Sequence, residues 1–282
     1  MASSATSSVS SNAAAVLGAL LEARTGQQLA SYRSWRLDTA LIPLLRERGL
    51  DTLDQLVALL LSGRDPGIGD RIVDALVNGE SSFFRDSAVF DQLVEAVAEH
   101  EAAGHRVRLW SAGCATGQEP LSLAMIFAER QADQGAAMPE IVASDVSEQA
   151  LARARAGRFT QFEIQRGLPI RRMMRWFEGD GGDWQARPDL VRLIQFRRQN
   201  LVADRAPPGR FDLILCRNVL IYLSPATKAR VFETLAQALR PGGTLVLGAG
   251  ETVIGHSDAF EPCRRFRGFY RRVGGEEKLA AA

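Results

Sequence analysis

The hydrophobic positions change their spacing near residue 100. From Ala14 to about His100 they recur at helical spacing, and no run there has the pattern of a strand. Further on, the apolar and β-prone run Val107–Trp110 leads into Ser111–Gly117, which is small and glycine-bearing, and then into the amphipathic segment Leu121–Ala128. This order of strand, glycine turn and helix opens a nucleotide-binding α/β sheet. The pattern therefore predicts an all-α N-terminal domain followed by an α/β domain with a mostly parallel sheet.

Short polar side chains mark the predicted helix starts. Asp51 precedes an apolar helical run that begins at Leu53, and Asp86 or Ser87 precedes another that ends at His100. Ser147 precedes a third helix. Such side chains accept a hydrogen bond from the first turn of a helix. We therefore predict that they are N-caps.

Two further predicted strands end in polar residues. Ile141–Asp145 is an apolar run that ends in a carboxylate, and Phe211–Cys216 is followed by Arg217 and Asn218. Open α/β sheets bind ligands at the carboxyl ends of their strands. Asp145 is placed there to accept hydrogen bonds from both hydroxyls of a ribose. A plain helix-capping role for this carboxylate is the alternative.

The remaining β-prone runs are expected to complete the α/β domain. Residues 190–201 alternate, which we interpret as part of a small β insertion at about 178–198 and not as another strand–helix unit. Phe260–Phe266 and Phe269–Val273 predict a closing antiparallel hairpin. The expected domains are then 14–86 (helices and linker) and 87–274 (α/β), between a disordered tail at 1–13 and a flexible tail at 275–282.

The glycine turn indicates which class of ligand the sheet binds. Gly113 and Gly117 allow a close backbone approach where a Cβ would clash. Three residues separate them, unlike in the dinucleotide fingerprint, and no Lys-Ser/Thr follows Gly117, unlike in a P-loop. An adenosine ligand that is not held by its phosphates fits the turn. The alternative is a tight connection without a ligand.

Composition narrows the class of protein. The 282 residues are 46% hydrophobic and 24% charged, which is ordinary for a soluble globular chain. A net charge of +1 argues against nucleic-acid binding, and no apolar run reaches the roughly 18 residues of a membrane span. The three cysteines are far apart and do not cluster with the three histidines, so no metal site is expected. We expect a cytoplasmic protein with no membrane insertion.

Six motifs in one order carry a resemblance to a known family. From Asn78 to Tyr270 the chain resembles the chemoreceptor glutamate methyltransferases, the CheR family. The motifs are Glu80–Asp86, Trp110–Pro120, Ala143–Asp145, Gln199–Leu201, Phe211–Tyr222 and Gly268–Tyr270.

The resemblance implies a fold, a reaction and a partner. The fold is a class I S-adenosylmethionine-dependent methyltransferase domain, Rossmann-like, behind the helical domain. The reaction transfers a methyl group from S-adenosylmethionine to glutamate side chains, giving methyl esters and S-adenosylhomocysteine. The partner is the cytoplasmic helical domain of chemoreceptors, methylated for chemosensory adaptation.

The resemblance also implies the site residues. A cofactor site would use Ser81, Arg85, Gly113, Gly117, Glu119, Asp145, Asn200, Leu201, Arg217 and Asn218. Glu119 would pair with the amino group of the methionine tail, and Asn200 and Leu201 would bind and cover the adenine. Arg85 and Tyr222 would lie near the transferred methyl group, as the catalytic pair on the substrate side.

Three departures from the family pattern bear on the partner. Gly79 stands where the first motif usually begins with Asn, and Asn78 lies one place earlier, so one hydrogen bond is missing or supplied differently. The second helix has few arginines for docking on a receptor. The insertion at 179–194 is short, so we expect no dependence on a receptor's C-terminal tail peptide.

Two alternative functions stay open at this stage. One is a signalling or scaffold module that binds S-adenosylmethionine without turnover. The other is a small-molecule or nucleic-acid methyltransferase on the same fold. Near-neutral charge and the lack of an Asn/Asp-Pro-Pro-Tyr/Phe motif after the strand at Phe211 count against base methylation.

Overall fold

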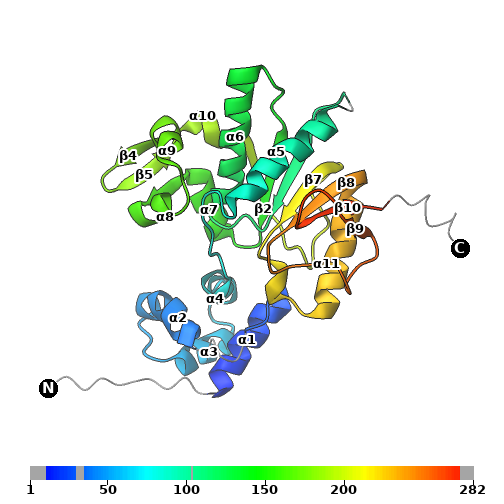
Figure 1. Ribbon diagram of the computed structural model, residues 1–282. Coiled ribbons are helices and arrows are strands. Elements are labelled where there is room, and N and C mark those ends of the chain that lie inside the picture. The colour runs from blue at the N-terminus through cyan, green and yellow to red at the C-terminus, as the bar shows by residue number, and fades with distance from the viewer. Residues whose placement is uncertain (1–10, 30–34, 103, 274–282) are drawn as a thin grey trace, which may run out of the picture. The chain divides into compact units, whose positions relative to one another are not determined.

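The structure, a computed structural model, describes residues 11–29, 35–102 and 104–273 (Figure 1). Its contacts group the chain into two compact units that divide after Asn78. The first unit also includes Tyr222–Ser224, and the second unit comprises Gly79–Ile221 and the chain from Pro225 onward. Both terminal tails expected from the sequence fall largely outside the described residues, although the first helix already begins at Ser11.

The first unit contains four helices. They are α1 (Ser11–Thr25), α2 (Trp35–Arg48), α3 (Leu53–Ser62) and α4 (Ile68–Leu76). Their apolar faces meet in one core, in which Leu17, Leu41, Leu56 and Ile72 are fully buried. Amphipathic helices of this length are stabilised chiefly by burying such a face.

The N-cap of α3 differs from the one predicted. Thr52, not Asp51, caps the helix: its side chain accepts from the N–H of Gln55 at 3.3 Å, and the Gln55 side chain accepts from the Thr52 N–H in return. This reciprocal capping box satisfies two backbone donors at once. A single Asp51 cap would satisfy one, so the arrangement with Thr52 is preferred.

The second unit is an α/β domain. Its strands are β1 (Arg108–Ala112), β2 (Glu140–Asp145), β3 (Arg158–Thr160), β4 (Phe177–Asp180), β5 (Asp183–Ala186), β6 (Ile194–Arg198), β7 (Phe211–Cys216), β8 (Leu239–Leu247), β9 (Phe260–Pro262) and β10 (Phe269–Arg272). Its helices are α5 (Ser87–Glu101), α6 (Gln118–Gln134), α7 (Glu148–Ala156), α8 (Gln161–Gln165), α9 (Ile170–Trp176), α10 (Pro188–Val191) and α11 (Pro225–Ala238), with a 3₁₀ turn at Leu220–Tyr222.

Seven strands form the large sheet in the order β6-β2-β1-β7-β8-β10-β9. The first five are parallel neighbours, and β10 pairs antiparallel with both β8 and β9, which confirms the α/β class and the closing hairpin. The chain runs from β1 to β2 on one side, whereas β7 lies on the other side of β1. Strand order therefore reverses between β1 and β7, the position at which open α/β sheets bind ligands.

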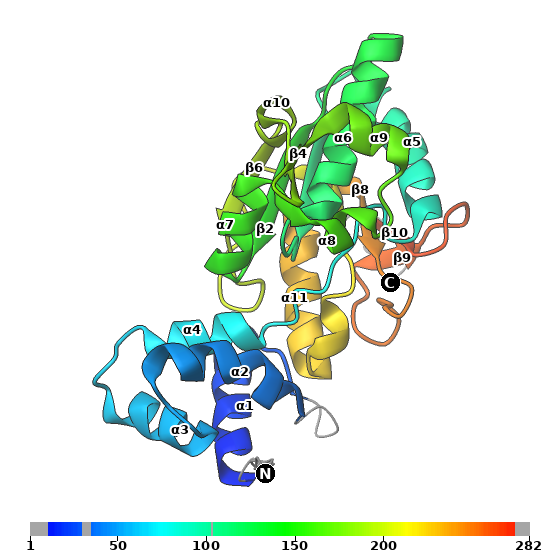
Figure 2. The same cartoon turned by 90° about the vertical axis from the view of Figure 1, so that its left-hand side faces the viewer.

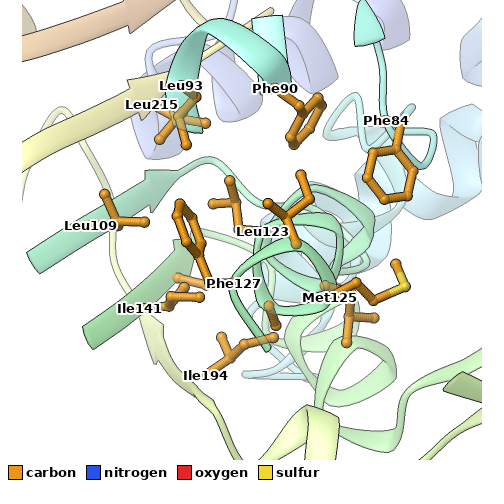
Figure 3. Close-up of a cluster of buried hydrophobic side chains, with 14 of the residues drawn as sticks. Phe84, Phe90, Leu93, Leu109, Leu123, Met125, Phe127, Ile141, Ile194 and Leu215 are labelled. Atoms are coloured by element: carbon orange, nitrogen blue, oxygen red, sulfur yellow. The ribbon is translucent and has the colours of Figure 1, made fainter. Parts of the chain in front are cut away.

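An apolar core packs α5 and α6 against the large sheet. Figure 3 shows Phe127 and Leu123 of α6 facing Leu109 of β1 and Ile141 of β2, with Leu93 of α5 on the same cluster. All five side chains are at most 1% exposed. Burying side chains of this size contributes about 1.5–3 kcal/mol each, so the loops after β1 and β2 start from rigid positions.

The expectation for residues 178–198 is wrong in part. β6 is not in the small insertion: it pairs in parallel with β2, from Ile141 opposite Ile194 to Asp145 opposite Arg198. The small sheet has the order β3-β5-β4 and so includes β3. β6 is an edge strand with one neighbour, so its exposed residues alternate with buried ones and imitate an antiparallel ribbon.

The small sheet lies with α8, α9 and α10 at one edge of the second unit. This edge is on the left in Figure 1 and faces the viewer in Figure 2. The linker packs against it through Phe83, whose ring makes edge contacts with Phe159 and Phe177 at 5.0 and 5.5 Å. Such contacts hold the segment before Arg85 on the α/β unit.

In the part of the chain that the structure describes, no helix combines the length and apolar character needed to cross a membrane.

Candidate functional site

The glycine turn joins the ends of three strands. The N–H groups of Gly113 and Cys114 donate to the Ser144 carbonyl at 2.8 and 2.9 Å, which ties the loop after β1 to β2. Gly113 has φ +78°, and a Cβ there would lie 2.5 Å from a methyl group of Val219, in the loop after β7. Glycine is thus required by backbone conformation and by packing against this loop.

Gly117 plays a similar role where the loop enters α6. Its φ is +95°, and a Cβ would lie 2.9 Å from the Ala154 Cβ of α7. Both glycines therefore permit a close approach within the protein itself. The loop is fixed between β2, α7 and the segment after β7.

Asp145 holds the loop after β1 from the end of β2. One carboxylate oxygen accepts the Ala115 N–H at 2.9 Å and the other accepts the Ser147 N–H at 2.9 Å. The α7 cap itself is Ser147, whose hydroxyl accepts from Ala150 at 3.1 Å, as predicted. Asp145 is thus not a plain cap. Each carboxylate oxygen has a second lone pair, so the group can still accept from a ribose.

The stretch after β6 is attached to the same place. The Gln199 N–H donates to the Asp145 carbonyl at 2.8 Å, which sets Asn200 and Leu201 directly after the end of β2. The Asn200 side-chain oxygen accepts from Val202 at 2.9 Å. This turn shapes the backbone that presents Leu201, which is half-buried.

Arg217 joins three distant segments at the end of β7. Its guanidinium donates to Glu119 at 3.1 Å, to Asp86 at 2.7 Å and to the Arg85 carbonyl at 2.8 Å. The Arg217 side chain is only 2% exposed, so these charge-assisted bonds act in a poorly hydrated place. Glu119 also accepts from the Ser111 hydroxyl at 2.8 Å. Its carboxylate is thereby held in one orientation at the start of α6.

Asp86 differs from its expected role. It occupies the N-cap position of α5, but its side chain makes no cap hydrogen bond there and its backbone is left-handed, with φ 58°. The carboxylate binds Arg217 instead. A contact between positions 131 apart could not be read from local sequence.

Glu251 is a functional candidate that the sequence reasoning missed. Its carboxylate accepts from the N–H groups of Asn218, Leu220 and Gly248, at 2.7, 2.7 and 2.8 Å. One side chain thus organises the loop after β7 and the end of β8. The available signal was its position four residues after β8, at the same edge of the sheet as Asp145 and Arg217.

Residues with a left-handed backbone conformation lie in the segments that form this site. Among the described residues other than glycine, a positive φ occurs only at Phe84, Asp86, Ala115 and Asn218. Such conformations cost on the order of 1–3 kcal/mol each and gather at functional sites. All four lie in the linker, the glycine turn or the loop after β7.

Buried polar atoms that have no hydrogen-bond partner in the protein indicate whether S-adenosylmethionine fits this site. Among the described residues these atoms are Gln199 Oε1, Arg217 Nε and Asn218 Oδ1. All three follow β6 or β7 at the carboxyl edge of the sheet. An unpaired buried polar atom costs about 1–3 kcal/mol, so these atoms favour a polar ligand. Together with the carboxylates Glu119 and Asp145, they match the amino, carboxyl and hydroxyl groups of S-adenosylmethionine.

The thiols and imidazoles do not serve this site as bases. Burial raises the pKa of Cys114 and of Cys216 well above the usual range, and nearby carboxylates raise it further. The three histidines are engaged elsewhere: His100 with Thr244, His105 with Asp212, and His256 stacked on Phe232. Within the described residues, no group of three acidic, Cys or His side chains could hold a metal ion.

The predicted substrate-side residues occupy different units. Ser81 and Arg85 are half-buried in the linker of the second unit. Tyr222 belongs by its contacts to the helical unit, where its hydroxyl accepts from the Asn78 amide and its carbonyl accepts from the Gln28 N–H at 2.8 Å. At Gly79 a Cβ would meet open space. No steric clash therefore requires a glycine here in place of the asparagine that is usual at this position in the family.

Residues 79–268 match the family described as "CheR methyltransferase, SAM binding domain". A chemotaxis protein methyltransferase of Vibrio parahaemolyticus is 37% identical over 86% of this chain and 90% of its own. Chemotaxis protein methyltransferase 1 of Pseudomonas aeruginosa is 35% identical over the same shares.

Solved structures show a weaker likeness. An S-adenosylmethionine-dependent methyltransferase from Mesorhizobium loti is 26% identical over 50% of this chain and 46% of its own, with a TM-score of 0.28, which is too low to support an argument. The matched range contains every residue of the candidate site described above. Asn78 and Gln28, which bind Tyr222 in the helical unit, lie outside the matched range. The chain belongs to the CheR methyltransferase family and carries its S-adenosylmethionine-binding domain.

Proposed function

We propose that the protein methylates glutamate side chains of chemoreceptors, giving glutamate methyl esters and S-adenosylhomocysteine for chemosensory adaptation. The observation that carries this proposal is that, among the described residues, the histidines and the two buried cysteines do not serve the site as bases, and its carboxylates are already engaged, Glu119 and Asp86 by Arg217 and Asp145 and Glu251 by backbone N–H groups. A hydroxyl or ammonium acceptor would have to lose a proton. A glutamate, with an ordinary pKa of about 4.3, is already a carboxylate.

The task left to the protein is orientation. S-adenosylmethionine supplies an electrophilic methyl group on a positively charged sulfur. Alignment of a nucleophile in such a site can supply about 7–11 kcal/mol in favourable cases. Arg85 is our candidate to steer the incoming carboxylate, because Arg217 holds its backbone by the 2.8 Å bond to its carbonyl. Tyr222 would position the same carboxylate through its hydroxyl.

The cofactor-binding roles follow the geometry. Glu119, fixed by Ser111 and Arg217, is oriented to accept from the methionine ammonium. Asp145 would accept from the ribose, while Asn200 and Leu201 would bind and cover the adenine. Arg217 Nε and Asn218 Oδ1 are buried without a hydrogen-bond partner in the protein and, with Ser81, would bind the polar groups of the methionine tail. These assignments are proposals for this chain.

The relatives' names supply the partner class. The relatives are named chemotaxis protein methyltransferases, and on that basis we propose the cytoplasmic helical domain of a chemoreceptor as the substrate and the cytoplasm as the site of action. The turn between β4 and β5 is short, with Asp180 opposite Asp183. This supports activity without a receptor tail peptide.

The test is methyl transfer from labelled S-adenosylmethionine to a receptor cytoplasmic fragment, followed by alkaline release of the label. We expect base-labile incorporation by the wild type. Arg85→Ala should lower kcat/KM about 100-fold, as expected when a reacting group is misplaced, and Tyr222→Phe should lower it less. Arg197→Ala, at an exposed arginine on β6, is the matched control and should keep full activity.

Binding measurements separate the competing functions. Calorimetry with S-adenosylhomocysteine should show binding by the wild type and by both variants. Cofactor binding without incorporation into any receptor from the same cell would contradict the proposed function and favour the scaffold module.

A further inference from the structure

We propose that Ser122 and Gly167 are positioning residues for methyl transfer, which hold the linker backbone so that Arg85 is presented to the substrate carboxylate. The inference rests on the proposed function, in which Arg85 steers that carboxylate. Ser122 and Gly167 both lie against one peptide group, the one that joins Phe83 to Phe84. We call this group the clamped peptide.

The N–H side of the clamped peptide is held by α6. The Phe84 N–H donates to the Ser122 hydroxyl at 3.1 Å, and that hydroxyl donates to the Gln118 carbonyl at 2.7 Å. Ser122 is fully buried and Phe84 is 7% exposed, so water does not take the place of this acceptor. A buried N–H without an acceptor is costly. Loss of the hydroxyl should therefore move the linker.

The C=O side of the clamped peptide lies against the turn between α8 and α9. Gly167 in this turn has φ +85°, and a Cβ on it would overlap the Phe83 carbonyl oxygen. The neighbouring Arg166 carbonyl accepts the Phe83 N–H at 3.1 Å. The clamped peptide is trans, so its N–H and C=O point in opposite directions. Ser122 and Gly167 therefore hold it from two sides.

The backbone on either side of Arg85 has an uncommon conformation. Phe84 and Asp86 both have positive φ, 48° and 58°. Residues other than glycine keep such conformations only where the surrounding structure determines them. The clamped peptide fixes the chain before Arg85, and Arg217, which donates to the Arg85 carbonyl at 2.8 Å, fixes the chain after it. The Cα of Arg85 is thus held from both ends.

The Arg85 side chain is held less firmly than its backbone. Its guanidinium lies 3.5 Å from the Glu80 carbonyl oxygen, which is longer than the usual N–H···O distance of about 2.7–3.2 Å. The direction in which the side chain points therefore depends mainly on the backbone. A displacement of about 1 Å at a reacting group can lower the rate about 100-fold. A small shift of the clamped peptide is thus enough to impair the reaction.

The alternative is a role in packing alone. The Phe83 ring packs edge-on against Phe159, and the centroid of the Phe84 ring lies 5.3 Å from that of Phe90 (Figure 3). These rings anchor the linker, but a hydrogen bond also sets the direction of the peptide group that donates it. A packing role predicts lower stability with an unchanged rate for the folded enzyme, whereas a positioning role predicts a lower kcat.

The test is a double-mutant cycle in the full-length protein, with labelled S-adenosylmethionine and a receptor cytoplasmic fragment. Ser122→Ala should lower kcat about 10-fold or more, because it releases the clamped peptide, and should leave the affinity for S-adenosylhomocysteine unchanged in calorimetry. In an Arg85→Ala background the same substitution should change kcat less than about twofold, because a residue that acts through the Arg85 side chain has no effect without it.

The control for Ser122→Ala is Thr52→Ala. It removes another hydroxyl that accepts a backbone N–H, at the start of α3 in the helical unit. It should keep the wild-type kcat, because α3 does not contact the linker through this bond.

Gly167→Ala tests the other side of the clamped peptide. Its Cβ would displace the Phe83 carbonyl, so we expect the same fall in kcat and the same lack of effect in the Arg85→Ala background. Gly135→Ala is the control and should keep the wild-type kcat, because Gly135 also has a positive φ, 67°, but a Cβ there meets no atom within 4 Å. Gly167 lies at an exposed position, so this variant carries the cycle if Ser122→Ala does not fold.

Hydrogen exchange measures the clamped peptide without reference to activity. The Phe84 amide should exchange slowly in the wild type, because its N–H is buried and bonded. It should exchange faster in Ser122→Ala and in Gly167→Ala, and at the wild-type rate in both controls.

Each outcome decides between the two proposals. If the substitutions leave kcat unchanged, or lower it equally with and without the Arg85 side chain, Ser122 and Gly167 are not positioning residues and the proposed function stands. An unchanged exchange rate of the Phe84 amide likewise overturns the inference alone. Failure of the wild type to methylate any receptor fragment overturns the proposed function, and the positioning role with it.

Discussion

At the scale of single residues, Glu251 sets the backbone on which Arg217 and Asn218 are presented. Its carboxylate accepts from N–H groups on both sides of the loop after β7, and Asn218 there is left-handed with φ 59°. A carboxylate accepts through two oxygens with about four lone-pair sites. No neutral side chain offers as many acceptors in the same space.

Glu251→Gln should therefore weaken cofactor binding. The amide keeps one oxygen but turns an NH₂ group toward backbone donors, and leaving buried donors unpaired costs about 1–3 kcal/mol. We expect S-adenosylhomocysteine affinity to fall about 10-fold or more by calorimetry, the equivalent of 1.4 kcal/mol. Glu233→Gln, at an exposed position on α11, is the control. Equal affinities for both variants would show that Glu251 does not position the loop.

The cysteines give a second test at this scale. Burial raises the pKa of the Cys114 and Cys216 thiols, whereas Cys263 is half-buried. The thiolate is the reactive form. Iodoacetamide at neutral pH should therefore modify Cys263 first, and the other two only in urea, as read by peptide mass spectrometry. Modification of Cys114 in the folded protein at the rate of Cys263 would contradict the structure.

At the scale of elements, the sequence pattern was sufficient to predict strands that are buried on both faces. β2 and β7 are continuous apolar runs followed by polar residues, so both strands and the polar residues at their carboxyl ends could be predicted. β6 could not be placed, because Ile194 and Phe196 alternate with exposed residues and an edge strand pairs on one side only. Its partner is fixed by the whole sheet, which local sequence does not encode.

The candidate site likewise contains residues that the sequence could predict and residues that it could not. Gly113, Asp145 and Arg217 belong to contiguous motifs, and the structure brings the segments that carry them together. The partners Asp86 and Glu251 lie far from Arg217 and Asn218 in sequence and near them in space. Contacts of that kind depend on how strands are ordered. Local sequence therefore does not predict these contacts.

The capping box of α3 provides a test at this scale. Thr52→Ala should lower the stability of the helix by about 1 kcal/mol, because it leaves the Gln55 N–H without its acceptor. Asp51→Ala is the matched control and should change stability by less than about 0.5 kcal/mol. Hydrogen exchange of the α3 amides would measure both. A larger loss for Asp51→Ala would restore the cap predicted from the sequence.

At the scale of the whole molecule, chain order and contact grouping differ at Tyr222–Ser224. This segment lies between elements of the α/β unit but is grouped with the helices, where Leu223 forms a bridge with Gln27. The position of the Tyr222 side chain is thus set by the helical unit through Asn78.

Global stability should depend on pH through His100. Burial lowers its pKa in the folded protein, so below the ordinary value of about 6.5 the unfolded chain binds more protons than the folded one. Stability should then fall as pH drops from 7 toward 5. Asp212 and Glu99 oppose the effect, while Arg271 and His105 add to it. His100→Gln should flatten this slope in urea unfolding at pH 7.5 and 5.5, and an unchanged slope would exclude His100 as its source.

The shared guanidinium of Arg217 has an evolutionary consequence. Asp86, Glu119 and the Arg85 carbonyl all accept from it, and its side chain is 2% exposed, so losing Arg217 would leave the largely buried Glu119 without its cationic partner. Lysine offers no planar fork with which to reach the same three acceptors. The residues at positions 119 and 217 should therefore change together in evolution or stay unchanged, and related chains that differ at one of them should carry a compensating change at the other.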